Sequence, residues 1–125
     1  MNILFVSLGC DKNLADSEMM LGLLRKKGYT FTDDEEQADI VIVNTCCFIG
    51  DAKEESIQTL LEMAELRRAG RLKALIAAGC LSQRYQEEIR KEISEVDALV
   101  GTTALEDITE AVEAALEGRG GNYYR

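Results

Sequence analysis

The chain has 125 residues, 46% of them hydrophobic, and no apolar run near the roughly 20 residues of a membrane-spanning helix. We therefore expect one domain with its own core, and MNILFVSLG lacks the basic region and cleavage site of a secretory signal, which favours the cytoplasm. A net charge of −9 argues against direct nucleic-acid binding, and the absence of histidine excludes Cys-His nucleophile pairs and His zinc ligands.

Apolar and amphipathic segments alternate along the first half of the chain. A strand is predicted over Ile3 to Ser7, then a helix from Leu14 to Lys27 that Gly28 ends. Tyr29 to Thr32 is short and β-prone, which is typical of an edge strand. The four β-branched residues from Ile40 to Val43 predict a central strand that is buried on both faces.

The second half of the chain continues this alternation. The predicted elements are a helix from about Asp51 to Ala69, a strand from Lys73 to Ala78, a helix capped by Ser82 with Tyr85, Ile89 and Ile93 facing the sheet, a strand from Ala98 to Val100 and a helix that opens with Thr103 and Glu106 in capping-box spacing. The basic group of Arg67, Arg68, Arg71 and Lys73 suits the negative end of the first of these helices. After Leu116 the composition changes to EGRGGNYYR, which predicts a linker.

These elements predict an α/β domain over residues 1–117, with residues 118–125 starting a linker to a further domain of a longer protein. Strands that alternate with helices indicate three layers: a mostly parallel sheet of about five strands with helices on both faces, as in flavodoxin-like and Rossmann-like folds. Because the short second strand fits an edge, we expect the flavodoxin-like strand order 2-1-3-4-5.

Three of the four cysteines directly follow predicted strands: Cys10 after ILFVSLG, Cys46 after DIVIVNT and Cys80 after KALIAAG. The carboxyl ends of parallel strands lie along one edge of a sheet, so these thiolates are expected to meet there. Cys47 points elsewhere if the backbone is extended at that position, and we expect it not to be a ligand.

For each of the other functions that are common on this scaffold, the chain lacks a residue that the function requires. SLGCDKN is poor in the hydroxyls that flavin mononucleotide needs, and Asp16 stands where a Cys-x5-Arg phosphatase needs arginine. Asn44 stands where a receiver domain needs an aspartate, and no G-x-G-x-x-G follows a strand.

Thiolates without histidine leave zinc or an iron–sulfur cluster as the metal options. Structural zinc sites usually draw on closely spaced C-x2-4-C pairs, whereas these cysteines lie singly on three loops, which favours iron–sulfur. Three thiolates would leave one iron of a 4Fe-4S cluster open. The alternative that stays open is a non-catalytic flavodoxin-like domain whose cysteines are structural or bind zinc.

Three stretches resemble a known family: SLGCDKNLADSE from Ser7 to Glu18, NTCCFI from Asn44 to Ile49 and GCLSQRY from Gly79 to Tyr85. They look like the three signatures of the amino-terminal domain of radical-SAM methylthiotransferases, in order and over essentially the whole chain. SLGC-x-KN with DSE, and GCL-x-QRY, are most similar to the RimO-like branch, which modifies an aspartate of ribosomal protein S-twelve. The MiaB-like branch, which modifies tRNA adenosine, is the alternative.

The resemblance implies that Cys10, Cys46 and Cys80 bind an auxiliary 4Fe-4S cluster, whose open iron holds the sulfur that is inserted at a C–H bond. S-adenosylmethionine and a second 4Fe-4S cluster would bind to a radical-SAM domain with a C-x3-C-x2-C motif, which this chain lacks. The implied partners are that radical-SAM domain, to which residues 118–125 would be the start of the linker, and a C-terminal domain of the same polypeptide. The implied substrate is ribosomal protein S-twelve. The fragment alone is therefore expected to be inactive.

Two positions depart from the family pattern: Cys47 stands where glycine is usual, and Asp11 where proline is common. Each cysteine loop is expected to run into a helix N-terminus, whose N–H groups can hydrogen-bond cluster sulfurs. Further possible donors, which also suit caps and turns, are Ser7, Asn13, Asn44, Thr45, Ser82 and Gln83.

Overall fold

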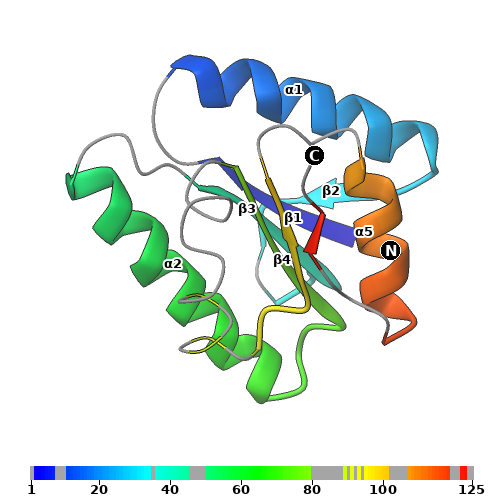
Figure 1. Ribbon diagram of the computed structural model, residues 1–125. Coiled ribbons are helices and arrows are strands. Elements are labelled where there is room, and N and C mark those ends of the chain that lie inside the picture. The colour runs from blue at the N-terminus through cyan, green and yellow to red at the C-terminus, as the bar shows by residue number, and fades with distance from the viewer. Residues whose placement is uncertain are drawn as a thin grey trace.

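The computed structural model describes residues 2–7, 11–34, 36–45, 50–79, 89, 91, 93, 95–101, 107–118 and 122–123. Within them the chain forms a six-stranded sheet in the order β2-β1-β3-β4-β5-β6, with every pair parallel and helices on both faces (Figure 1). The α/β class and the flavodoxin-like order of the first five strands are therefore confirmed.

The elements follow the predicted alternation, with shifts of a residue or a few at their ends. They are β1 (Asn2–Ser7), α1 (Asp11–Lys26), β2 (Thr30–Thr32), β3 (Ile40–Thr45), α2 (Gly50–Arg68), β4 (Ala74–Gly79), β5 (Ala98–Val100), α5 (Ile108–Leu116) and β6 (Asn122–Tyr123). The helix predicted after Ser82 falls largely outside the described residues, as does the capping pair of Thr103 and Glu106. In the described part of the chain, no helix is both long and apolar enough to span a bilayer.

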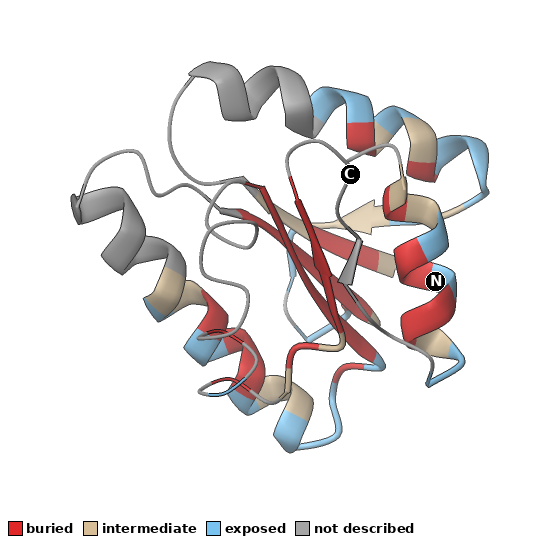
Figure 2. Cartoon of the chain, in the orientation of Figure 1, coloured by how far each residue is buried: buried red, intermediate tan, exposed pale blue. Residues whose placement is uncertain are grey.

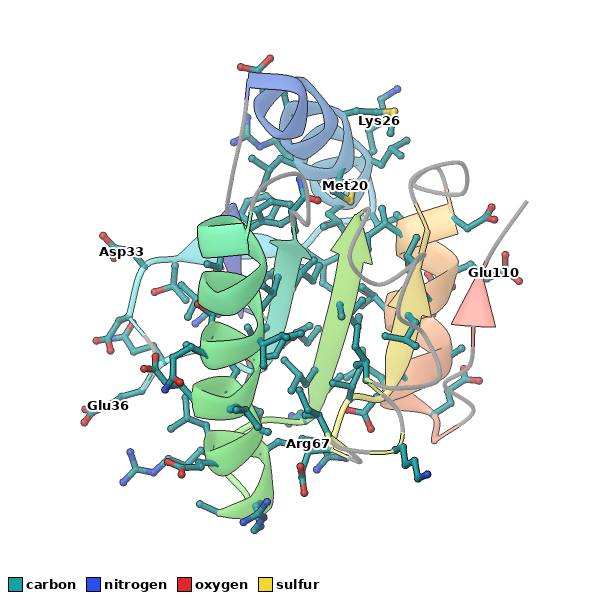
Figure 3. All side chains as sticks on the ribbon, turned by 60° about the vertical axis from the view of Figure 1, so that its left-hand side comes forward. Met20, Lys26, Asp33, Glu36, Arg67 and Glu110 are labelled. Carbon is teal, nitrogen blue, oxygen red and sulfur yellow. The ribbon has the colours of Figure 1, made fainter. Side chains whose placement is uncertain are left out.

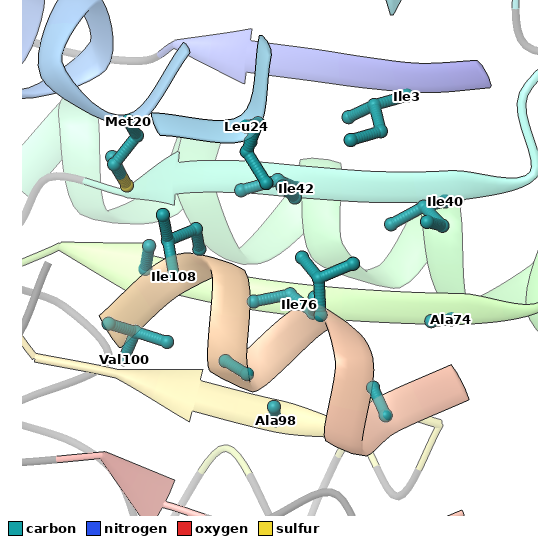
Figure 4. Close-up of a cluster of buried hydrophobic side chains, with 14 residues drawn as sticks. Ile3, Met20, Leu24, Ile40, Ile42, Ala74, Ile76, Ala98, Val100 and Ile108 are labelled. Carbon is teal, nitrogen blue, oxygen red and sulfur yellow. The ribbon is translucent and has the colours of Figure 1, made fainter. Parts of the chain in front are cut away.

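The core lies on both faces of the central strands, as the run of β-branched residues predicts. Ile40 to Val43 are fully buried, and because side chains alternate along a strand they divide between the two faces. Ile40 and Ile42 pack with α1 and α5, in the cluster that Figure 4 shows, and Val41 and Val43 pack with α2. Figure 2 shows the same division, with a buried sheet between helices whose outer faces are exposed.

The segment after Leu116 departs from the expectation of a plain linker. Asn122 and Tyr123 form β6, which pairs in parallel with Leu99 and Val100 of β5. A strand of two residues is held by backbone hydrogen bonds and has no periodic pattern, so composition alone does not reveal it. The domain boundary at residue 117 stays a prediction.

Two aspartates tie the amino ends of neighbouring strands together. Asp39, just before β3, accepts the N–H of Asn2 at 3.0 Å and donates its own N–H to the Asn2 carbonyl at 2.9 Å. Asp97, just before β5, makes the same two bonds to Leu75, each at 2.8 Å. These bonds join β3 to β1 and β5 to β4, and so help to set the register on which the opposite edge depends.

Asp97 also anchors the end of α2. Arg67 donates from Nε to Oδ2 at 3.0 Å and from Nη2 to Oδ1 at 3.3 Å. The hydrogen bond to Asp97 raises the pKa of Arg67, the negative charge of Asp97 adds to this, and partial burial opposes it. Arg68 forms an ion pair with Glu95 at 3.1 Å. Arg67 and Arg68 at the end of α2 therefore interact with acidic side chains as well as with the negative pole of the helix. Figure 3 places Arg67 at the tail ends of the strands, away from the arrowheads near Met20.

Replacing Asp97 with alanine should lower the free energy of unfolding by about 1.5–3 kcal/mol, because the Leu75 N–H and the Arg67 guanidinium both lose a charged acceptor. Arg68→Ala is the matched control: its side chain is 70% exposed, and such a pair contributes about 1 kcal/mol or less. Urea denaturation measures both. Equal losses in the two variants would contradict the role given to Asp97.

Candidate functional site

The carboxyl ends of β1, β3 and β4 lie side by side at one edge of the sheet (Figure 1). The register pairs Ser7 with Asn44 and Asn44 with Ala78, and one step further Thr45 with Gly79. Adjacent strands are about 4.8 Å apart, so the three loops that follow begin within about 10 Å of one another.

The cysteines themselves lie outside the described residues, as do Ser82 and Gln83. Their positions in the sequence still relate them to this edge. Cys46 and Cys80 each come directly after a member of the Thr45–Gly79 pair, and Cys10 comes three residues after Ser7. The convergence of three thiolates remains a prediction. Among the described residues, no group of three or more His, Cys, Asp or Glu that could hold a metal ion occurs.

Two of the described helices begin shortly after cysteine loops, as the sequence predicts. The 16-residue helix α1 starts at Asp11, immediately after Cys10, and Asn13 is its third residue. The helix α2 starts at Gly50, four residues after Cys46. A helix N-terminus carries N–H groups without intrahelical partners and a partial positive charge, so two such ends follow two of the cysteine loops.

The described strand ends at this edge carry no titratable side chain. β1 ends in Phe-Val-Ser, β3 in Val-Asn-Thr, and β4 in Ala-Ala-Gly. The paired acidic and basic residues described above lie at the opposite, amino edge. This part of the carboxyl edge is therefore suited to holding a ligand between uncharged strand ends, and it offers no side chain for acid–base catalysis.

Asn44 is the one buried polar side chain among the residues that the structure describes, and none of its surface is exposed. It lies on the central strand β3, between Ser7 of β1 and Ala78 of β4. Of the six possible donor residues predicted from the sequence, it is the one whose side-chain burial is described. Ser7 and Thr45 are placed at strand ends by their backbone alone.

Gly79 is a feature of the site that the pattern of the strands does not reveal. It ends β4 with a φ of 97°, in the left-handed region that residues with a side chain rarely adopt. The strand therefore turns at the residue before Cys80, and only glycine makes this turn without strain. The sequence feature that could have predicted this turn is the Gly-Cys pair that opens GCLSQRY. An isolated glycine at a strand end often marks a special backbone conformation.

Comparison with known proteins supplies the family. Residues 2–101 match the model of the family described as "Uncharacterized protein family UPF0004". The chain belongs to the UPF0004 family. The match covers the three motifs from which the resemblance was drawn, and that resemblance is confirmed.

Several relatives of the chain carry the name "Ribosomal protein uS12 methylthiotransferase RimO", where uS12 is the ribosomal protein S-twelve. The protein of Lachnoclostridium phytofermentans is 63% identical over 118 residues, which cover 94% of this chain and 27% of the relative. That of Natranaerobius thermophilus is 52% identical over 124 residues, covering 99% and 28%. That of Clostridioides difficile is 50% identical over 117 residues, covering 94% and 26%. The chain thus spans about a quarter of the length of these relatives.

Gly79→Ala should lower the free energy of unfolding by about 1–2 kcal/mol, the cost of a left-handed backbone for a residue with a Cβ. Gly70→Ala should cost a similar amount, because Gly70 has a φ of 81° and an added Cβ there would meet nothing within 4 Å. Gly22→Ala is the opposite control: Gly22 lies in α1 with open space around it, so alanine should stabilise by about 0.5–1 kcal/mol. Urea denaturation compares the three, and a stabilising Gly79→Ala would show that β4 does not end as described.

Proposed function

We propose that this chain is the amino-terminal, auxiliary-cluster domain of a radical-SAM methylthiotransferase that modifies an aspartate of ribosomal protein uS12. In this proposal Cys10, Cys46 and Cys80 bind a 4Fe-4S cluster. The observation that carries it is the register of β1, β3 and β4, which starts the three cysteine loops at one edge of the sheet. The shared name of the relatives supports the substrate.

The described surroundings fit a cluster with three thiolate ligands. The strand ends themselves are uncharged, and the carboxylate that follows most closely in sequence is Asp11, the first residue of α1. The N-termini of α1 and α2 follow two of the loops, and their N–H groups favour negative charge. Iron–sulfur clusters prefer thiolate ligands, and a site without histidine matches that preference.

The chain's own contribution is to bind and orient. The three thiolates would bind three irons, and the helix ends would offset negative charge. When bound, such a cluster supplies an iron without a protein ligand, which is open to the sulfur that is to be transferred. No described side chain at this edge is assigned a proton-transfer step.

The rest of the reaction belongs to parts of the polypeptide outside this chain. We assign S-adenosylmethionine and the second 4Fe-4S cluster to a radical-SAM domain, since this chain lacks a C-x3-C-x2-C motif. On this proposal residues 1–117 form the body of the domain, and residues 118–125 add β6 to its sheet and lead toward the next domain. The protein works in the cytoplasm without direct nucleic-acid contact by this domain. The chain alone would be inactive.

Two alternatives have less support. A tRNA adenosine methylthiotransferase would use a similar domain, but relatives at 50–63% identity carry the uS12 name. Structural or zinc-binding cysteines would leave the protein colourless, whereas an iron–sulfur protein absorbs broadly at roughly 400 nm.

Anaerobic reconstitution with iron and sulfide tests the ligand set. Cys10→Ala, Cys46→Ala and Cys80→Ala should each lose most of the bound iron and the EPR signal after reduction, because each removes one of three thiolates. Cys47→Ala is the matched control and should bind as much iron as the unaltered chain. Loss of the cluster in the Cys47 variant, with retention in one of the other three, would contradict the assignment.

A chimera tests the function of the whole protein. This chain should replace the corresponding first quarter of the Lachnoclostridium phytofermentans relative, to which it is 63% identical, without loss of aspartate methylthiolation of uS12. Mass spectrometry of uS12 measures the product. The same chimera with Cys46→Ala should be inactive, and the chain alone should give no product. A chimera that binds its clusters and leaves uS12 unmodified would contradict the proposed substrate.

A further inference from the structure

Asn44 stands out because it is the one fully buried polar side chain among the residues that the structure describes. Side chains alternate along β3, so Asn44 belongs to the same face as Ile40 and Ile42. The core cluster on that face includes Met20 of α1, Ala78 of β4 and Ile108 of α5. Figure 4 shows Met20 and Ile108 toward the arrowhead ends of the strands, which is the end at which Asn44 lies.

A buried amide at this position needs hydrogen bonds, because moving it out of water is unfavourable unless they compensate it. An apolar side chain of similar size would need none and would continue the pattern of Ile40 and Ile42. Ala78, the residue paired with Asn44 on β4, is small and leaves room for a larger side chain at position 44. That side chain need not be polar to fill the space. The choice of asparagine therefore points to a partner that needs hydrogen bonds.

The position of Asn44 identifies where such a partner lies. Asn44 comes two residues before Cys46, and its partner on β1, Ser7, comes three residues before Cys10. The helix α1, which begins directly after Cys10, covers the same face of the sheet. Asn44 thus lies one residue before the end of β3, beside the last residue of β1, and the Cys10 and Cys46 loops follow these two strand ends.

We propose that Asn44 is a positioning residue whose carboxamide hydrogen-bonds the backbone of the loops that carry Cys10 and Cys46, and so holds their thiolates at the separation that a cluster requires. This inference rests on the proposed function. A carboxamide suits the task because it both donates and accepts, up to four hydrogen bonds in all. It also brings no charge, whereas an aspartate would oppose an anionic cluster.

The test separates cluster binding from stability. Asn44→Leu is expected to lower the stability of the cluster-free chain modestly in urea denaturation, because the loop backbone groups lose their hydrogen-bond partner. Its iron affinity in anaerobic reconstitution with limiting iron and sulfide should fall about 10-fold or more, the range for residues that orient metal ligands, and its EPR g-values after reduction should shift. Asn44→Ser, which keeps a donor and an acceptor on a shorter side chain, should recover part of the affinity.

Ile42→Val is the matched control on the same strand and face. It should lower the urea midpoint of unfolding, because it removes a buried methylene, and leave iron binding and the EPR spectrum unchanged. If the unaltered chain binds a cluster and Asn44→Leu binds it equally well with the same spectrum, the inference is wrong and the proposed function stands. If the unaltered chain binds no cluster, both fail. Should Asn44→Leu not fold, Asn44→Ser decides: affinity and spectrum equal to those of the unaltered chain would overturn the inference.

Discussion

The parallel register of β1, β3 and β4 is the constraint on which the other features of this domain depend. In a parallel sheet the carboxyl ends of all strands lie along one edge, so the register decides which residues lie next to one another there. A strand shifted by one residue would also turn every one of its side chains to the opposite face of the sheet. Here the register is held by the buried β-branched residues of β3 and, at the amino edge, by hydrogen bonds that Asp39 makes with Asn2 of β1 and with Lys73, just before β4. Polar contacts at one edge thus determine where the loops begin at the other.

The two edges of the sheet have different chemistry. The amino edge carries charged side chains in hydrogen-bonded pairs, among them Arg67 with Asp97, and these secure α2 against the sheet. The described strand ends at the carboxyl edge are uncharged, and two helices begin shortly after them. Such an edge favours an anionic ligand held by neutral strand ends and helix dipoles. That division agrees with a site for a thiolate-bound cluster.

Local patterns in the sequence predicted the sheet well, because its central strands are recognisable from their own residues. The run from Ile40 to Val43 is buried on both faces as expected, and the short β2 lies at an edge. Features that depend on long-range geometry were not predicted: the bidentate pair of Arg67 with Asp97, the left-handed Gly79 and the two-residue β6. For the site, the sequence predicted which strands precede the cysteines. The positions of the thiolates depend on loops that no periodic pattern describes.

The most direct test of the central claim is Mössbauer spectroscopy of the chain reconstituted with iron-57 and sulfide, before and after addition of an external thiol. Three cysteine ligands leave one iron of a 4Fe-4S cluster open, so the account predicts that the signal of one iron in four changes when the thiol binds. A spectrum in which no iron responds would mean that the protein ligates all four, with Cys47 as the available fourth thiolate. That result would contradict a three-cysteine site with an open iron.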